Sequence, residues 1–139
     1  MPGLLTHLIV ALAGFLIVYF IFYKSKTKNR IIYGLAFVLG HILPDVVDFG
    51  VLGVKMGSIN PSEIMQNPLF DTLAVFGHTF SNWLIIGLVV IAIAFFFYSI
   101  KKVSKKSFIS LIISIISILI GILAHLVLDR LIQETSYWI

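Results

Sequence analysis

Four long apolar stretches occupy most of this chain of 139 residues. Hydrophobic residues make up 60% of the chain and charged residues only 12%, so a soluble domain of this size could not cover its apolar surface. A helix needs roughly 20 apolar residues to cross a bilayer core. The sequence therefore predicts an all-α polytopic membrane protein, with a single transmembrane domain over residues 1–139. We expect a bundle of four transmembrane helices at about residues 4–23, 31–45, 77–100 and 108–131, with the second helix broken at Pro44.

The basic residues indicate how the helices are oriented. Eight of the ten lysines and arginines lie in two short segments, residues 24–30 and 101–106. The positive-inside rule places both segments in the cytoplasm, with the N-terminus, the connection over residues 46–75 and the C-terminus outside the cytoplasmic membrane. The net charge of +4 comes from these two segments, so it predicts contact with membrane lipid and not with nucleic acid. The outer connection is rich in glycine and proline and could fold over the outer face as a loop or lid.

All four histidines and all six acidic residues lie toward the predicted outer side. His7, Asp45, His78 and His125 are 15 to 23 residues from the nearest basic segment. At about 1.5 Å per helical residue, those separations correspond to roughly 22–35 Å, close to the ~30 Å hydrocarbon core. We therefore expect these side chains to meet at one level near the outer boundary.

Helical spacing predicts which way these side chains face. One face of the fourth stretch carries Ser110, Ser114, Ser117, Gly121, His125 and Asp129. Small residues in a membrane helix mark the side where neighbouring helices pack closely, so the histidine and aspartate should point into the bundle. Similar faces recur as His7, Ala11 and Gly14 in the first stretch, and as Gly34, Val38, His41, Asp45 and Asp48 in the second.

Ionisable groups inside membrane spans are costly to bury, which makes a functional site the default hypothesis for them. The candidate metal ligands are His7, Asp45, Asp48, His78, His125 and Asp129. The chain has no cysteine, and nitrogen and oxygen donors suit Zn²⁺, with Mn²⁺ or Fe as alternatives, in a site of one or two ions. Asp45 and Asp48 are also the candidate catalytic residues. Further candidates are His41 and Asn82 as ligands, and Lys55 and Arg130 for binding phosphate.

Four motifs occur in an order that resembles the membrane-bound metal-dependent hydrolases. They are Thr6-His7, Leu43-Pro44-Asp45-Val46-Val47-Asp48, Phe76-Gly77-His78-Thr79 and His125-Leu126-Val127-Leu128-Asp129-Arg130. This family includes a LexA-regulated inner-membrane hydrolase, and some members are distantly similar to zinc-dependent phospholipase C. The resemblance covers nearly the whole chain and implies a metal centre built from the six candidate ligands. Many relatives have a second histidine soon after the one that matches His78, where this chain has Asn82.

These residues predict metal-dependent hydrolysis of a phosphoester at the outer membrane boundary. The expected substrate is a lipid phosphoester. Three alternatives stay open. The same ligands could serve a metal-binding or metal-transport protein without hydrolysis, although a transport path should carry polar residues through the whole depth of the bundle. Paired histidines could ligate haem, which would not require the aspartates. A purely structural membrane protein would bind no metal.

Overall fold

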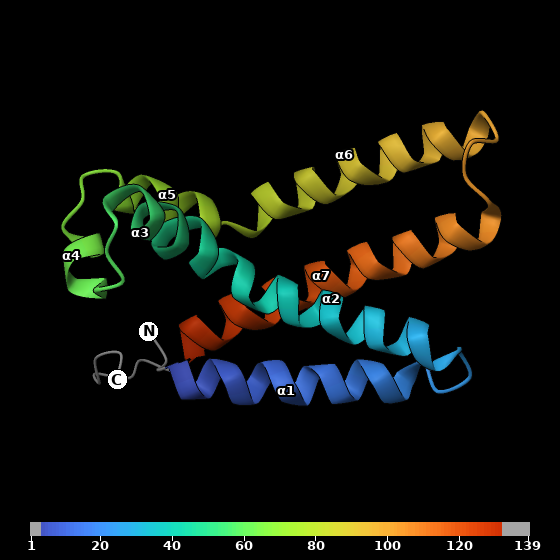
Figure 1. The fold of residues 1–139 in the computed structure, drawn as a ribbon, viewed down its shortest axis with the longest axis horizontal. Helices are drawn as coiled ribbons and strands as arrows, with labels where there is room; N and C mark the ends of the chain where they lie inside the picture. The colour runs from blue at the N-terminus through green and yellow to red at the C-terminus, as the bar shows by residue number, and fades with distance from the viewer. Residues whose placement is uncertain (1–3, 132–139) are drawn as a thin grey trace.

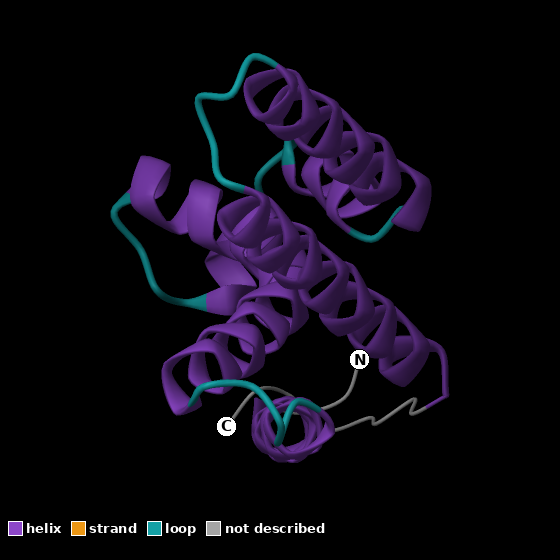
Figure 2. Ribbon diagram, turned by 90° about the vertical axis from the view of Figure 1, so that its right-hand side faces the viewer, coloured by secondary structure: helices purple, strands orange, loops and turns teal. Residues whose placement is uncertain are grey.

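The computed structural model describes residues 4–131, which form helices and contain no strand (Figures 1 and 2). The helices are α1 (Leu4–Ile21), α2 (Thr27–Asp45), the π-helix η1 (Val46–Gly50), α3 (Val51–Met56), α4 (Pro61–Met65), α5 (Phe70–Gly77), α6 (Phe80–Ser99) and α7 (Lys105–Leu131). The predicted all-helical class is confirmed for this range. The prediction that both termini lie outside the cytoplasmic membrane concerns mainly residues outside the described range 4–131.

Three helical stretches are long and apolar enough to cross a membrane, judged by length and composition. They are Thr27–Met56, which joins α2, η1 and α3, then Phe80–Ser99 and Lys105–Leu131. Helix α1 is equally apolar but shorter. Large apolar side chains such as Phe20 and Ile85 remain exposed on these helices, which is the surface that contact with lipid requires. The fold is that of a membrane protein.

The long helices run back and forth along one axis, so alternate connections between them lie at opposite ends (Figure 1). The turns that join α1 to α2 and α6 to α7 lie at one end, and most of the basic residues lie in these turns or in the first residues of α2 and α7. The short helices α3, α4 and α5 gather at the other end. Helix α2 packs against both α1 and α7, whereas α6 packs against α7 and α5. The α2–α7 pair therefore forms the centre of the molecule.

Two glycines allow the backbones of α2 and α7 to touch. A Cβ atom at Gly121 would lie 2.2 Å from the Phe37 carbonyl oxygen, and one at Gly40 would lie 2.0 Å from the Ile118 oxygen. No other residue fits at such a crossing. On α7, Ser117, Gly121 and His125 are all buried, so the inward face expected from the small-residue spacing is confirmed. The same crossing brings His41 toward His125.

Pro44 lies buried near the end of α2. Proline has no N–H to donate, and the π-helix η1 begins two residues later, at Val46. Such π turns often occur at functional sites. The chain then continues as α3 until Gly57, whose positive φ of 66° ends the helix. Residues after Pro44 thus stay helical up to Met56.

The connection over residues 46–75, expected as an outer loop or lid, contains the short helices α3 and α4 and most of α5. Leu52 of α3, Ile64 of α4 and Phe70 of α5 are buried against one another. The side chain of Asn60 accepts a hydrogen bond from the Ser62 N–H at the start of α4, which caps this helix. The connection therefore has a small apolar core of its own beside the end of α2.

Candidate metal centre

The four histidines come from four separate segments and meet at the end of the bundle opposite the basic turns. His7 lies on α1, His41 on α2, His125 on α7, and His78 at the junction of α5 and α6. The ring centroid of His125 lies 4.5 Å from that of His7, 5.3 Å from that of His41 and 5.5 Å from that of His78. His125 is therefore at the middle of the cluster. His41 and His125 are fully buried, and His7 is 5% exposed.

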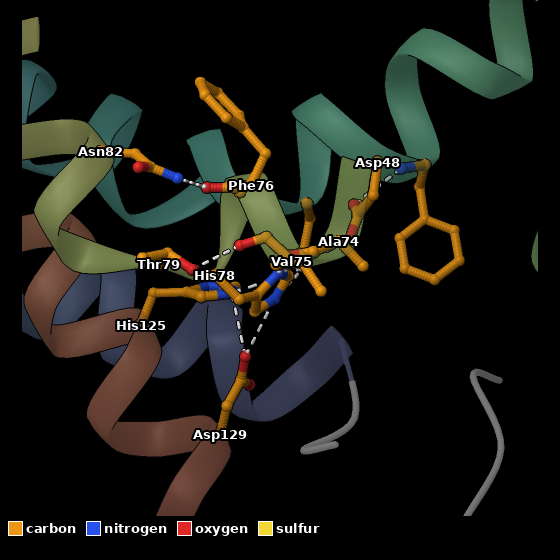
Figure 3. Close-up of polar contacts among 12 residues, drawn as sticks. Asp48, Ala74, Val75, Phe76, His78, Thr79, Asn82, His125 and Asp129 are labelled. Carbon is orange, nitrogen blue, oxygen red and sulfur yellow. Dashed lines mark hydrogen bonds and ion pairs between the residues drawn. The ribbon is translucent and has the colours of Figure 1, made fainter. Parts of the chain in front are cut away.

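Two carboxylates approach the imidazole nitrogens directly. Asp129 Oδ2 lies 3.2 Å from His125 Nε2 and 3.3 Å from His78 Nε2 (Figure 3). The other oxygen, Oδ1, lies 3.4 Å from His7 Nε2. Asp45 Oδ1 lies 3.5 Å from His125 Nε2 and 3.9 Å from His78 Nε2. Both aspartates thus face the ring of His125.

The donor set fits a cation. Among the described residues, both ring nitrogens of His125 and both carboxylate oxygens of Asp129 are buried without a partner in hydrogen-bonding geometry. Buried polar atoms normally have partners, and leaving them without one costs roughly 1–3 kcal/mol each. A divalent ion between them would satisfy nitrogen and oxygen donors together. The buried histidines and aspartates can therefore hold a metal ion, of a kind that the geometry leaves open.

The potential ligand atoms fall into two groups that share His125. His7, His41 and His125 form one group, and Asp45, His78 and His125 form the other; within each group the atoms lie within 4.8 Å of one another. The first group is completely buried, whereas the side chains of Asp45 and His78 are 22% and 19% exposed. Metal sites with a purely structural role are closed, and catalytic ones keep a position open for water or substrate. The second group is the more accessible one.

The turn between α5 and α6 fixes the position of His78. The indole nitrogen of Trp83 donates a hydrogen bond to the Gly77 carbonyl at 2.6 Å, and the Asn82 amide donates to the Phe76 carbonyl at 3.1 Å (Figure 3). Both bonds join the end of α5 to the start of α6. His78 lies in the short turn between these two helix ends.

The two nitrogens of His78 have different surroundings. Nδ1 lies 3.1 Å from the Ala74 carbonyl oxygen and 3.6 Å from Asp48 Oδ2, while Nε2 faces Asp129 and Asp45. A proton on Nδ1 would be directed to these acceptors, which leaves Nε2 for a metal. His78 lies outside the membrane-spanning segments, and its polar contact with the Asp129 carboxylate raises the pKa of this histidine above its ordinary value.

The remaining candidates from the sequence lie around the cluster. Asp48 is fully buried and belongs to neither group of potential ligands; it faces the Nδ1 side of His78. The Asn82 amide N–H donates to the Phe76 carbonyl, and Asn82 belongs to neither group of potential ligands. Lys55 and Arg130 are exposed and make no ion pair within residues 4–131. The candidate phosphate-binding residues are thus not in contact with the cluster.

Two contributors were not found from the sequence. Trp83 gave no signal beyond being an aromatic residue with an N–H group five positions after His78. Gly40 could have been found, since it is a small residue directly before His41, on the helix that contacts α7. Both position histidines without belonging to the donor set.

Replacing Asp48 with asparagine should weaken metal binding by about 10–100-fold, as is typical when a carboxylate beside a ligating histidine is lost. Asparagine keeps the oxygen that accepts from the Phe49 N–H at 2.7 Å but removes the charge beside His78 Nδ1. Zinc competition with a chromophoric chelator would measure the change. Asp71→Asn, at the exposed start of α5, is the matched control and should bind as the unaltered protein does. Equal affinity in the Asp48 variant would contradict this role.

Comparison of the chain with family models, with curated proteins and with solved structures finds no match. The resemblance to the membrane-bound metal-dependent hydrolases thus stays an expectation drawn from four sequence motifs.

Proposed function

We propose that this chain is a four-helix protein of the cytoplasmic membrane, with its two basic turns in the cytoplasm. Three helices of sufficient length, together with the shorter apolar α1, support this arrangement. The two turns lie at the same end of the molecule, and together with the first residues of α2 and α7 they hold eight of the ten basic residues. The histidine cluster, at the opposite end, would then lie near the outer membrane boundary.

Within that membrane, we propose a metal-dependent hydrolase that acts on a lipid phosphoester and belongs to the family that its motifs resemble. The main support is that Asp45, which forms the accessible group with His78 and His125, lines a cavity of about 710 Å³. Asp45, His7 and His41 line this cavity. Cavities of roughly 300–1,000 Å³ with a few convergent polar groups are typical of small-molecule sites. A substrate in this cavity would reach the carboxylate of Asp45.

The residues divide the chemistry between them. A bound divalent ion would supply a Lewis acid and lower the pKa of a water molecule toward neutrality. His78 and His125 would hold the ion together with Asp129, whose Oδ2 lies 3.2 to 3.3 Å from both imidazoles. Asp45, the third member of the accessible group, would stay loosely bound at the edge of the cavity and accept the proton from the attacking water. Arg130 and Lys55 are not in the wall of the cavity, so either could neutralise the phosphoryl oxygens only after its side chain or the substrate moved.

Metal binding without hydrolysis is the second candidate function. The group of His7, His41 and His125 favours it, because all three side chains are buried and buried sites are typical of structural metals, although His7 and His41 also line the cavity. Transport is less well supported, since the serines in the other half of α7 are occupied: Ser110 accepts from Tyr33, and Ser114 and Ser117 donate to backbone carbonyls. Haem is disfavoured because the rings of His7 and His125 stack directly, 28° apart in plane, with no space for a macrocycle between them.

Hydrolysis of phosphoesters by the purified protein tests the proposal. Detergent-solubilised protein loaded with Zn²⁺ or Mn²⁺ should hydrolyse p-nitrophenyl phosphate, bis-p-nitrophenyl phosphate or a short-chain phosphatidylcholine. Turnover should disappear with a chelator and return with the metal. Asp45→Asn should lower the rate by about 10²–10⁴-fold, the usual contribution of a general base. Ser117→Ala, a buried change on α7 away from the cluster, should keep the rate. Bound metal without turnover of any of these esters would favour the non-catalytic function.

A further inference from the structure

The cavity beside the cluster is a groove with one polar end. It lies between the start of α1, the α2–η1–α3 helix and α4, and has a volume of about 710 Å³. Its polar end is formed by His7, His41 and Asp45. Away from that end the wall is mainly apolar, with Leu8, Val46, Phe49, Val54, Ile59 and Ile64 among its residues.

The far end of the groove is open and surrounded by exposed apolar side chains. Val54 is 86% exposed and Ile59 is 99% exposed. Both belong to the wall of the groove, and Val54 lies within the apolar stretch Thr27–Met56 that is long enough to cross a membrane. A ligand would therefore pass from an apolar opening to the edge of the histidine cluster.

A glycine keeps the groove wide. Gly50 belongs to the wall, and a Cβ atom built on it would meet only the Val46 side chain, at 3.3 and 3.6 Å. Its backbone is ordinary right-handed helix, with φ −67° and ψ −49°, so a larger side chain could be accommodated without backbone strain. Such a side chain would extend into the groove.

We propose that this groove binds one acyl chain of a lipid phosphoester and brings its phosphate to the polar end, where Asp45 of the accessible group lines the wall. The apolar wall suits a hydrocarbon chain and offers few partners for the backbone N–H and C=O groups that a protein segment would bring. An amphiphile matches both ends of the groove. The placement of the phosphate rests on the proposed hydrolase function, whereas the acyl-chain site does not require hydrolysis.

Photolabelling with dodecyl phosphate that carries a diazirine on its chain tests the groove in the whole detergent-purified protein. Peptides that contain Val46, Val54 and Ile64 should be labelled, and Gly50→Trp should reduce their labelling by about tenfold or more by filling the groove. Val51→Trp is the matched control. Val51 is the next residue, is 51% exposed and is not part of the wall, so its variant should be labelled as the unaltered protein is.

A second pair of variants from α1 guards against a folding defect at Gly50. Leu8→Trp fills the groove from the opposite wall, and Leu12→Trp lies one turn further along α1 and off the groove. The first should lose labelling and the second should keep it. Labelling that is equal in all four variants, or absent from the groove of the unaltered protein because a second copy or another part of this chain fills it, would overturn the proposal.

The outcomes separate this inference from the proposed function. Groove labelling that Gly50→Trp blocks, in a protein that hydrolyses no phosphoester, would support the acyl-chain site and contradict the hydrolase. Metal-dependent hydrolysis with no labelling of the groove would support the hydrolase and contradict the acyl-chain site. Labelling should also persist in chelator-treated protein, because the apolar wall contains no metal ligand beyond its polar end.

Discussion

Replacing His125 with alanine should remove the bound metal and, with it, any hydrolytic activity. His125 is the one residue common to both groups of potential ligands, and it is fully buried. Losing a group beside a ligand typically costs about 10–100-fold in metal affinity, so losing a shared ligand should cost more. Elemental analysis of the purified variant should find a metal-to-protein ratio close to zero.

Two further variants make the His125 result interpretable. Asp129→Asn keeps the shape of the side chain that lies 3.2 Å from His125 Nε2 while removing its charge, and it should also bind less metal. Ser117→Ala changes another buried residue of α7, whose hydroxyl donates to the Ile113 carbonyl. It should retain full metal content. A His125 variant that keeps its metal would contradict the proposed centre.

Replacing Gly121 with alanine should separate α2 from α7 and abolish metal binding. The added Cβ would lie 2.2 Å from the Phe37 carbonyl oxygen and 2.8 Å from the His41 nitrogen. Both are backbone atoms, so the collision can be relieved only by moving a helix. Overpacking in a well-packed core typically costs about 1–3 kcal/mol, occasionally more. We expect a lower thermal unfolding temperature and loss of bound metal.

Gly87→Ala is the matched control for this change. It adds the same methyl group to a membrane helix, but the nearest atoms belong to the Leu119 side chain, at 3.2 to 3.6 Å. A leucine side chain can move by the few tenths of an ångström required, so this variant should unfold near the temperature of the unaltered protein. Equal stability of the two variants would show that α2 and α7 do not touch at Gly121.

The sequence predicted the convergence of the histidines because two simple regularities act together. The number of residues between each histidine and the nearest basic segment predicted its depth in the membrane. The small residues on α7 predicted that His125 and Asp129 point into the bundle. The contacts of His125 with His7, His41 and His78 agree with that argument. His41, which the sequence left as a further candidate, is fully buried within the cluster.

The details near Pro44 could not be predicted in the same way. Asp45 and Asp48 are three residues apart, and α-helical spacing would place them on one face. The π-helix η1 begins directly after Asp45 and contains Asp48. Both carboxylates approach His78, but Asp45 does so at Nε2 and Asp48 at Nδ1, a division that the spacing alone does not predict. Likewise, the glycines and prolines of residues 49–71 indicated a loop. Packing of Leu52, Ile64 and Phe70 stabilises short helices there, and no local sequence pattern encodes such long-range contacts.

X-ray absorption spectroscopy at the zinc edge, on protein purified with zinc, tests the metal centre most directly. We predict that only nitrogen and oxygen atoms coordinate the zinc, at about 2.0–2.2 Å. The spectrum should also show the multiple-scattering pattern of two or more imidazole rings. Protein that retains no zinc, or zinc whose spectrum shows no imidazole, would contradict the claim that these histidines and aspartates form a metal site.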